Sequence, residues 1–181
     1  MSTFIALLRG INVGGQKKIT MTDLKKLFEV SGFTNVQTYI QSGNVIFESQ
    51  NSNTKAIKNQ IEKKVKEKYK FDVEVFITSN NELKNILRKN PFIKKKKDAE
   101  RFYVTFLSEK PDSVNISKLN ETNYLPEEYI IDGNVIYLYF PNGYGKAKLN
   151  NNLFENKLKV PATTRNWKTV NMLFELSKRG T

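Results

Sequence analysis

The amino-acid sequence repeats one order of predicted elements in its two halves, and this repeat constrains the fold more than any motif does. In the first half, FIALLRG, VQTYI, NVIFES and VEVFIT predict strands, because short apolar or alternating runs are typical of sheets. Helices are predicted after Thr20 and over residues 54–69, where apolar residues recur at helical spacing. The order strand, helix, strand, strand, helix, strand is that of the ferredoxin-like fold.

The second half gives the same order. RFYVTFLSE predicts a strand, residues 113–120 a helix, and YIIDGNVIYLYF two strands joined by a tight Asp-Gly turn. A helix near Leu149 to Leu158 and an extended PATT segment follow, and then a last helix. We therefore predict an α+β protein of two tandem ferredoxin-like (βαββαβ-type) subdomains with an additional C-terminal helix. The subdomains would cover residues 1–80 and 101–181, with a helical, lysine-rich connector over residues 81–100.

Two missing residue types exclude most familiar catalytic chemistry. The 181 residues include no cysteine and no histidine. Disulfides, thiol nucleophiles, Cys/His zinc sites and Ser-His-Asp triads are thereby excluded, and we predict neither a metal nor a cofactor. No apolar run is long enough to span a bilayer, and the N-terminal run lacks the features of a signal peptide. We expect a cytoplasmic protein without a membrane partner.

The charge balance favours polyanionic partners. Lys and Arg number 30 against 18 Asp and Glu, a formal net charge of +12. The lysines of residues 54–69 and the Lys94 to Lys97 run predict weak, salt-sensitive affinity for RNA or DNA, although a biased composition or a solvated helix face explains them equally well. Among the few arginines, Arg9 and Arg165 stand in unusual local sequence.

The segment after the first strand has the composition of an anion-binding loop. Arg9 and the Gly14-Gly15 pair come between a strand and a capped helix, which would direct backbone N–H groups and a helix dipole at a bound anion. The GxxxxGK[ST] motif is not satisfied, because Gln16 stands where its lysine would be. The alternative is a turn whose glycines supply positive φ.

Two further polar segments have parallel interpretations. In QSGN, Gln41, Ser42 and Asn44 offer amide and hydroxyl groups, or they form an ordinary hairpin turn. In TTRNW, Arg165 offers a guanidinium and Trp167 an aromatic plane for a phosphate and a base. Alternatively, Thr164 or Asn166 caps the last helix while the tryptophan packs in the core.

The tyrosines of the second half allow an RNA-binding interpretation. Strand alternation places Tyr137 and Tyr139 on one face, as in sheets that stack bases on aromatic rings. The sequence signature of RNA-recognition modules is missing, because Arg101 is followed by Phe102 and no glycine occurs in that strand. The alternative is that these tyrosines pack between the subdomains or beneath a helix.

Four segments together resemble a known family. ALLRGINVGG, TYIQSGNVIFES, PNGYGKAKLNN and PATTRNWKTVNML are similar to the signatures of the bacterial domain-of-unknown-function family 1697. The resemblance implies a cytosolic bacterial protein of two α+β halves with no activity generally assigned. Two departures are Ala147, where the family usually has serine, and Lys159, where it usually has glycine. The motif positions are Arg9, Gly10, Asn12, Gly14, Gly15, Gln41, Ser42, Gly43, Asn44, Tyr144, Lys148, Thr163, Thr164, Arg165, Asn166 and Trp167.

These observations predict a binding module for a phosphate-bearing ligand, a nucleotide or nucleic acid, in a cleft between the subdomains. One alternative is an enzyme acting on a phosphorylated or acyl substrate, with Lys148 or Tyr144 as the proton-transfer group. Another is a protein-interaction module. The oligomeric state is not predicted. The predicted ligand-binding residues are Arg9, Asn12, Gly14, Gly15, Gln41, Ser42, Asn44, Tyr144, Lys148, Thr164, Arg165 and Asn166.

Overall fold

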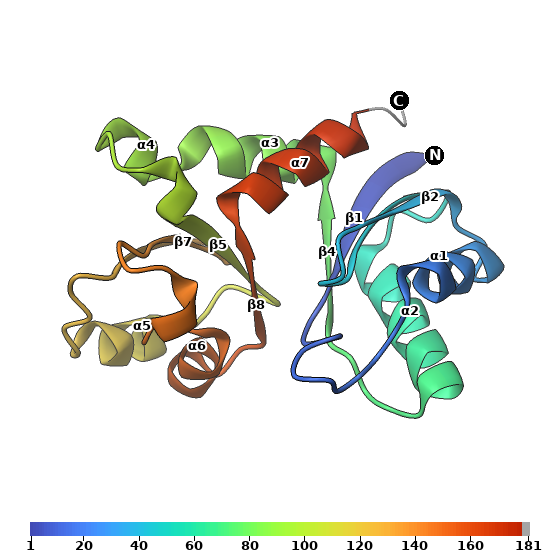
Figure 1. Ribbon diagram of the computed structural model, residues 1–181, viewed down its shortest axis with the longest axis horizontal. Helices are drawn as coiled ribbons and strands as arrows, with labels where there is room; N and C mark the ends of the chain where they lie inside the picture. Colours follow the sequence, from blue (N-terminus) through green and yellow to red (C-terminus); the bar gives the residue numbers. More distant parts are fainter. Residues whose placement is uncertain (179–181) are drawn as a thin grey trace. The chain divides into compact units, whose positions relative to one another are not determined.

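The computed structural model describes residues 1–178 and contains two compact units, each with a four-stranded antiparallel sheet (Figure 1). Unit 1 comprises Met1–Asn85 and the residues from Met172 onward, and unit 2 comprises Ile86–Asn171. Helices α3 (Asn80–Lys89) and α7 (Trp167–Ser177) each contribute residues to both units. The predicted α+β class is confirmed. Residues of the predicted connector form α3, α4 (Pro91–Lys94) and a short 3-10 turn, η1 (Ala99–Arg101).

Unit 1 follows the predicted order of elements. Its strands are β1 (Ser2–Leu8), β2 (Thr34–Tyr39), β3 (Asn44–Ser49) and β4 (Val75–Ser79), and its helices α1 (Met21–Val30) and α2 (Thr54–Tyr69) follow β1 and β3. The spatial order is β2-β3-β1-β4, so β1 pairs with β3 on one side and β4 on the other.

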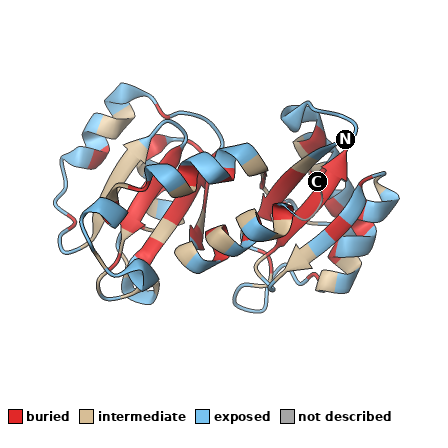
Figure 2. Cartoon of the chain, turned by 90° about the horizontal axis from the view of Figure 1, so that it is seen from above, coloured by how far each residue is buried: buried red, intermediate tan, exposed pale blue. Residues whose placement is uncertain are grey.

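The helices of unit 1 begin and end where the local sequence directs. Thr20 caps α1 by accepting a hydrogen bond from the Asp23 amide at 3.1 Å. Asn53 caps α2, and Lys70 ends it in the left-handed conformation at a φ of 63°. The apolar residues of both helices pack against one face of the sheet. Ile5 and Leu7, on the opposite face, are fully buried as well. Figure 2 shows that buried residues run along the strands of the sheets.

Unit 2 has the same order. Its strands are β5 (Phe102–Leu107), β6 (Glu128–Asp132), β7 (Val135–Tyr139) and β8 (Ala162–Asn166), arranged β6-β7-β5-β8. Helix α5 (Ser113–Asn120) follows β5, while a 3-10 turn, η2 (Tyr144–Lys146), and helix α6 (Asn151–Leu158) follow β7.

Both faces of the unit 2 sheet carry buried side chains. On one face, Ile136 and Leu138 pack in a cluster with residues of α5 and α6. On the other face, Tyr137 is 2% exposed and its hydroxyl donates to the Ile86 carbonyl oxygen at 3.1 Å. Burial, together with the charge of Asp132, raises the pKa of Tyr137 to about 12. An open base-stacking platform is therefore wrong for this tyrosine, which is a core residue.

Neither a membrane-spanning helix nor a cluster of metal-binding side chains occurs in residues 1–178. No helix in this range has the length and apolar character needed to cross a bilayer. Within the same range, no three Asp or Glu side chains are grouped as a metal ion would require.

Candidate functional site

The glycine-rich segment of unit 1 forms a small, tight hairpin after β1. The Gln16 amide donates to the Val13 carbonyl oxygen at 3.0 Å. Between them, Gly14 and Gly15 have φ values of 57° and 75°, and two consecutive positive values are what a type I′ turn requires. Residues 13–18 are exposed. The interpretation of these glycines as suppliers of positive φ is confirmed.

The Asn12 side chain fixes the base of this hairpin. Its amide nitrogen donates to the carbonyl oxygens of Ile19 and Gln41, each at 2.9 Å, and its amide oxygen accepts from the Ile19 amide at the same distance. The backbone of Asn12 is left-handed at a φ of 56°, which asparagine tolerates better than most residues. The hydrogen-bonding groups of Asn12 therefore organise the loop.

The QSGN segment is the hairpin turn between β2 and β3, as one interpretation predicted. Gly43 accepts a hydrogen bond from the Leu8 amide at 2.8 Å. Asn44 is fully buried, and its amide nitrogen donates to the Tyr39 carbonyl oxygen and the Ser42 hydroxyl, both at 3.0 Å. Asn44 therefore shapes the turn from inside, whereas Gln41 is exposed at its tip.

The first two motifs pack directly against each other in unit 1. Gly43 has a φ of 79°, and a Cβ atom there would lie 2.7 Å from the Ile11 Cδ1 atom and 3.0 Å from the Leu8 Cβ atom. Only a residue without a side chain fits this approach without displacing its neighbours. Together with the bond from Asn12 to Gln41, this contact joins the glycine hairpin to the QSGN turn.

The first turn of α1 is occupied by a carboxylate from the same helix. The Thr20 hydroxyl donates to the Asp23 Oδ2 atom at 2.8 Å, in addition to accepting from the Asp23 amide. A bound anion would meet this negative charge, so the helix dipole gives no support to the anion-loop interpretation. Unlike the first turn of α1, the backbone amides of Gly14 and Gly15 are open to a ligand, because they have no hydrogen-bond partner in the described chain.

Two exposed lysines lie beside these amides. The Lys17 ammonium donates to the Asp72 backbone carbonyl oxygen at 2.6 Å and lies 5.9 Å from the centre of the Phe71 ring. Lys18 is exposed and forms no ion pair within residues 1–178. The tip of the hairpin thus combines amide donors with two ammonium groups and holds no carboxylate.

The third motif lies in unit 2, after β7. The Tyr144 ring stacks on Tyr103, with ring centres 5.3 Å apart and planes 21° from parallel. The Glu127 carboxylate accepts the amides of Lys148 and Leu149 at 2.8 and 2.9 Å. This fixes the backbone while the Lys148 side chain is exposed.

The fourth motif is mostly strand, and its polar groups serve the fold. The Thr164 hydroxyl donates to the Asn151 Oδ1 atom and forms a second hydrogen bond with the Thr105 hydroxyl, each at 2.7 Å. Asn166 accepts the Thr169 amide at 2.8 Å and so caps α7. Of the two predicted caps, Asn166 is confirmed and Thr164 is wrong, because Thr164 lies inside β8.

Arg165 is a buried cation on β8. It is 7% exposed, and its Nη1 atom donates to the Thr163 hydroxyl at 2.9 Å and to the Thr164 carbonyl oxygen at 3.0 Å. Burial lowers the pKa of Arg165 to about 10, and Tyr144 acts in the opposite direction. The guanidinium therefore remains charged at neutral pH.

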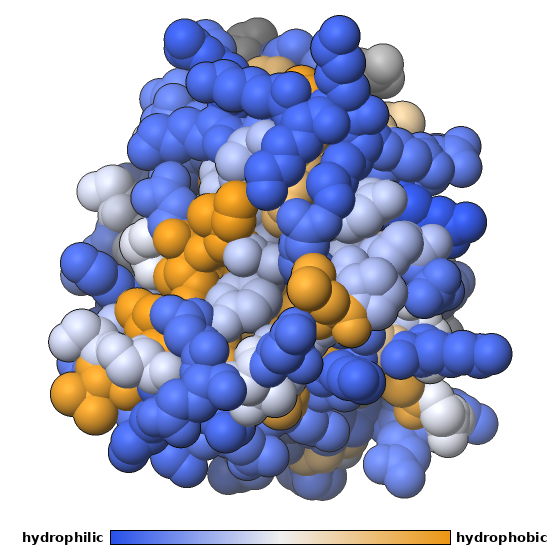
Figure 3. All heavy atoms as spheres, turned by 90° about the vertical axis from the view of Figure 1, so that its left-hand side faces the viewer, coloured by the Kyte–Doolittle hydropathy of each residue, from blue (hydrophilic) through white to orange (hydrophobic). Residues whose placement is uncertain are grey.

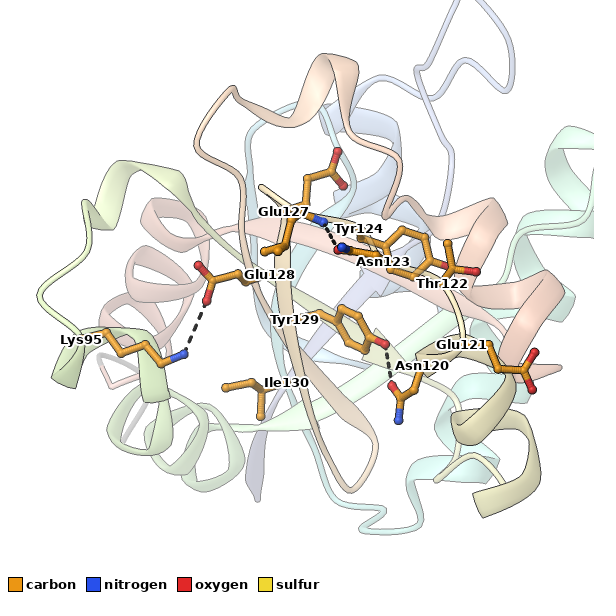
Figure 4. Close-up of a pocket in the computed structure, with 11 residues that line it drawn as sticks. Lys95, Asn120, Glu121, Thr122, Asn123, Tyr124, Glu127, Glu128, Tyr129 and Ile130 are labelled. Atoms are coloured by element: carbon orange, nitrogen blue, oxygen red, sulfur yellow. Dashed lines mark hydrogen bonds and ion pairs between the residues drawn. The ribbon is translucent and has the colours of Figure 1, made fainter.

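A pocket of about 450 Å³ opens in unit 2 beside β6, and none of the predicted site residues lines it (Figure 4). It is lined by Lys95 and by residues between Asn120 and Ile130. The Tyr129 hydroxyl donates to the Asn120 Oδ1 atom at 2.5 Å. Nothing in the local sequence marks this pocket, because its lining comes from a helix end, a loop and a hairpin strand.

Lys95 and Glu128 give one end of this pocket charged groups. Lys95 and Lys97 both pair with Glu128. Partial burial would raise the pKa of Glu128, but the hydrogen bonds and charges of the two lysines outweigh that effect and lower it.

Most of the lysines on α2 are paired with acids of unit 1. Lys58 binds Glu62 and Glu74, and Lys63 and Lys64 bind Glu67. Lys66 and Lys68 pair with Asp72 and Asp23. These pairs reduce the positive field along the helix, so the predicted affinity of α2 for nucleic acid stays a prediction of weak binding.

Comparison with known proteins identifies the family and leaves the activity open. Residues 1–137 match the family described as "Protein of unknown function (DUF1697)". No curated protein matches. A solved structure, that of the conserved bacterial protein SP0830 from Streptococcus pneumoniae, is 24% identical with a TM-score of 0.78, and the match covers 97% of this chain and 98% of that one. Because the family match spans well over half of the sequence, the chain belongs to the DUF1697 family.

Proposed function

We propose that the chain binds a phosphate-bearing ligand, a nucleotide or nucleic acid, and that the exposed hairpin tip of unit 1 supplies part of the site. The proposal rests on the donors exposed at this hairpin tip, residues 13–18. The Gly14 and Gly15 amides are unbonded, Lys17 and Lys18 are exposed beside them, and Asn12 holds the base of the loop fixed. Fixed amide donors next to ammonium groups are suited to phosphate oxygens.

The motif residues of unit 2 support the same chemistry. Lys148 offers an exposed ammonium on a backbone held by Glu127. Tyr144 adds a partly exposed aromatic ring of the kind on which a base stacks. The proposal therefore predicts that residues of unit 2, as well as the hairpin tip of unit 1, contribute to ligand binding.

We also propose that the two units are a tandem pair of ferredoxin-like subdomains. The element order of each unit, with strand orders β2-β3-β1-β4 and β6-β7-β5-β8, supports a tandem ferredoxin-like arrangement. The subdomain boundaries at residues 80 and 101 and the cytoplasmic location stay predictions.

A ligand screen with two matched variants tests the proposal. Thermal unfolding is measured with nucleotides, phosphosugars and short oligonucleotides, since a ligand at 100 times its Kd adds about 2.7 kcal/mol of stability. We expect Lys17→Ala/Lys18→Ala to lose the ligand-induced shift. Lys110→Ala/Lys118→Ala, which removes the same charge from exposed positions outside the motifs, should retain it.

Three results would contradict the proposal. The first is the absence of any shift across the screen with the unmodified chain. The second is an equal loss of the ligand-induced shift in both double variants, which indicates that total charge alone attracts the ligand. The third is binding that survives Lys17→Ala/Lys18→Ala at low salt and disappears at high salt, the behaviour of diffuse lysine contacts.

A further inference from the structure

A partly exposed aromatic ring lies beside the hairpin tip of unit 1. Phe71 belongs to the loop between α2 and β4, and part of its side chain packs against the core of this unit. The Lys17 ammonium reaches this loop from the hairpin, because it donates to the Asp72 carbonyl oxygen at 2.6 Å and lies 5.9 Å from the centre of the Phe71 ring. The hairpin and the loop therefore adjoin at one end of unit 1, the lower end in Figure 1.

A second aromatic ring holds Phe71 in place. Tyr69 stacks with it, with ring centres 5.8 Å apart and planes 23° from parallel. Aromatic rings favour such offset stacks, and every nucleobase has a flat π face of the same kind. The ring of Phe71 is therefore a suitable surface for a base.

Positive charge dominates the two segments that meet at this ring. Lys17 and Lys18 of the hairpin and Lys70 of the loop are exposed, and they form no ion pair within residues 1–178. The two acids of the loop, Asp72 and Glu74, are both paired with lysines of α2. Three ammonium groups therefore remain for a negatively charged ligand, together with the amides of the hairpin tip.

This charged, aromatic surface is open. Residues 13–18 and Lys70 are exposed, and Phe71 is partly exposed. Small ligands are typically held in concave pockets that bury most of their surface. Single-stranded nucleic acids instead lie along open, positively charged surfaces and stack their bases on aromatic side chains. The openness of the surface favours a single strand over a free nucleotide.

The apolar groups exposed elsewhere on the chain do not combine these features. Figure 3 shows apolar patches among hydrophilic residues on one side of the molecule. On unit 2, the exposed apolar residues include Val114 and Leu125, which are aliphatic and have no π face. Exposed apolar surface alone therefore does not identify a base-binding position, whereas an aromatic ring beside unpaired lysines does.

We propose that the phosphate-bearing ligand of the hairpin tip is a single-stranded nucleic acid, with one base stacked on Phe71. The adjoining phosphates bind the Gly14 and Gly15 amides and the ammonium groups of Lys17 and Lys18. This inference rests on the proposed function and adds to it the kind of ligand and the residue that contacts the base. Because stacking does not depend on which base is present, the binding tolerates any sequence.

Strands with and without bases test the inference. Fluorescence anisotropy is measured with a short single-stranded DNA and with an abasic strand of the same length, which carries the same phosphates and no base. The unmodified chain should bind the strand with bases about tenfold more tightly, because stacking of one base contributes an effect of this size. A duplex of the same sequence should bind more weakly than the single strand, because its base faces are covered.

Two substitutions of Phe71 separate its aromatic face from its packing. Phe71→Leu keeps an apolar side chain, so it should abolish the tenfold preference and leave the affinity for the abasic strand unchanged. That unchanged affinity also shows that the variant is folded. Phe71→Trp keeps an aromatic face and should retain the preference.

Two further variants serve as controls. Phe174 is also a partly exposed phenylalanine with a lysine over its ring, but that lysine pairs with Glu175. Phe174→Leu should therefore retain the preference for bases. Lys17→Ala/Lys18→Ala removes phosphate contacts alone, so it should lower the affinity for both strands by the same factor.

The inference and the proposed function fail by different results. Equal affinity of the unmodified chain for the two strands, a preference that survives Phe71→Leu, or a duplex that binds as tightly as the single strand would each overturn the inference. Stabilisation by mononucleotides without affinity for a single strand would overturn it as well. All four of these results leave a phosphate-bearing ligand in place. The proposed function fails by another result, in which no phosphate-bearing ligand, mononucleotides included, stabilises the chain.

Discussion

Replacing Gly43 by alanine should destabilise unit 1 more than the same change at any other glycine of the hairpin corner. The added Cβ atom would lie 2.7 Å from Ile11 Cδ1 and 3.0 Å from Leu8 Cβ. The isoleucine side chain can rotate away only into a packed core, and the Leu8 Cβ atom is fixed to the central strand β1. The φ of 79° adds backbone strain that alanine does not relieve.

The expected magnitude has two parts. A left-handed conformation costs a residue with a side chain about 1 kcal/mol or slightly more. Overpacking in a filled core costs about 1–3 kcal/mol. Gly43→Ala should therefore lower the free energy of unfolding by about 2–4 kcal/mol. Gly14→Ala is the matched control, because its φ is 57° and no atom lies within 4 Å of the added Cβ.

Urea unfolding followed by circular dichroism gives the free energy of unfolding of both variants. The difference between Gly43→Ala and Gly14→Ala isolates the cost of placing a Cβ atom against Ile11 and Leu8. Ile11→Val removes the Cδ1 atom that makes the shortest contact, so it should recover part of the loss in the Gly43→Ala background. A double-mutant cycle reports this coupling. The reasoning is refuted if Gly43→Ala and Gly14→Ala agree within about 0.5 kcal/mol, or if the cycle shows no coupling.

Three further outcomes follow from single contacts. Thr20→Ala removes the cap of α1 and should cost about 1 kcal/mol in urea unfolding, whereas Thr22→Ala, one residue inside the helix, should cost less. Tyr137→Phe removes the hydrogen bond to the Ile86 carbonyl and should also cost about 1 kcal/mol, so an unchanged midpoint would contradict the buried bond. Lys95 and Lys97 lower the pKa of Glu128 in the folded chain. The contribution of these ion pairs to the free energy of unfolding is therefore complete above the pKa of Glu128 in the unfolded chain, and it is lost as pH falls through the lower pKa of the folded chain. The unmodified chain should thus lose more stability on acidification than Glu128→Gln, and equal pH slopes would contradict this.

Elements with a strong local pattern were predictable from the sequence. Helix α2 spans Thr54–Tyr69 and α5 spans Ser113–Asn120, the same bounds that the sequence predicts. In α2, the buried positions Ile57, Ile61 and Val65 recur every four residues, so the stripe that marks the helix is also the face it buries.

The segment around Pro91 shows why local signals were insufficient elsewhere. A proline after a helical stretch favours the end of that helix, and α3 does end at Lys89, two residues before Pro91. Pro91 also begins a new helix, α4, where its missing N–H group costs nothing, and Asn90 caps that helix through the Phe92 amide. The local sequence signals the end of the first helix, whereas the second is also held by the packing of Phe92 against Phe102.

The roles of the motif residues depended on contacts distant in sequence. Asn12 bonds to a carbonyl oxygen 29 positions away, and Thr164 bonds to Asn151, 13 positions away. Spacing identifies such residues as polar and clustered, which suits a ligand site and a turn equally well. Only their hydrogen-bond partners distinguish the two roles.

Those partners separate the signature into two sets of residues. Asn12, Gly43, Asn44 and Asn166 are explained by the turns, the close approach and the cap that they form. The exposed hairpin tip is different, because a type I′ turn requires positive φ at two positions and places no demand on the residues that follow. Lys18 has no contact that the fold needs, and Lys17 reaches only a backbone carbonyl and a ring. A loss of ligand binding without a loss of stability is therefore expected at these lysines, whereas a change at Asn12 should lower stability and also release the loop that the proposed site needs.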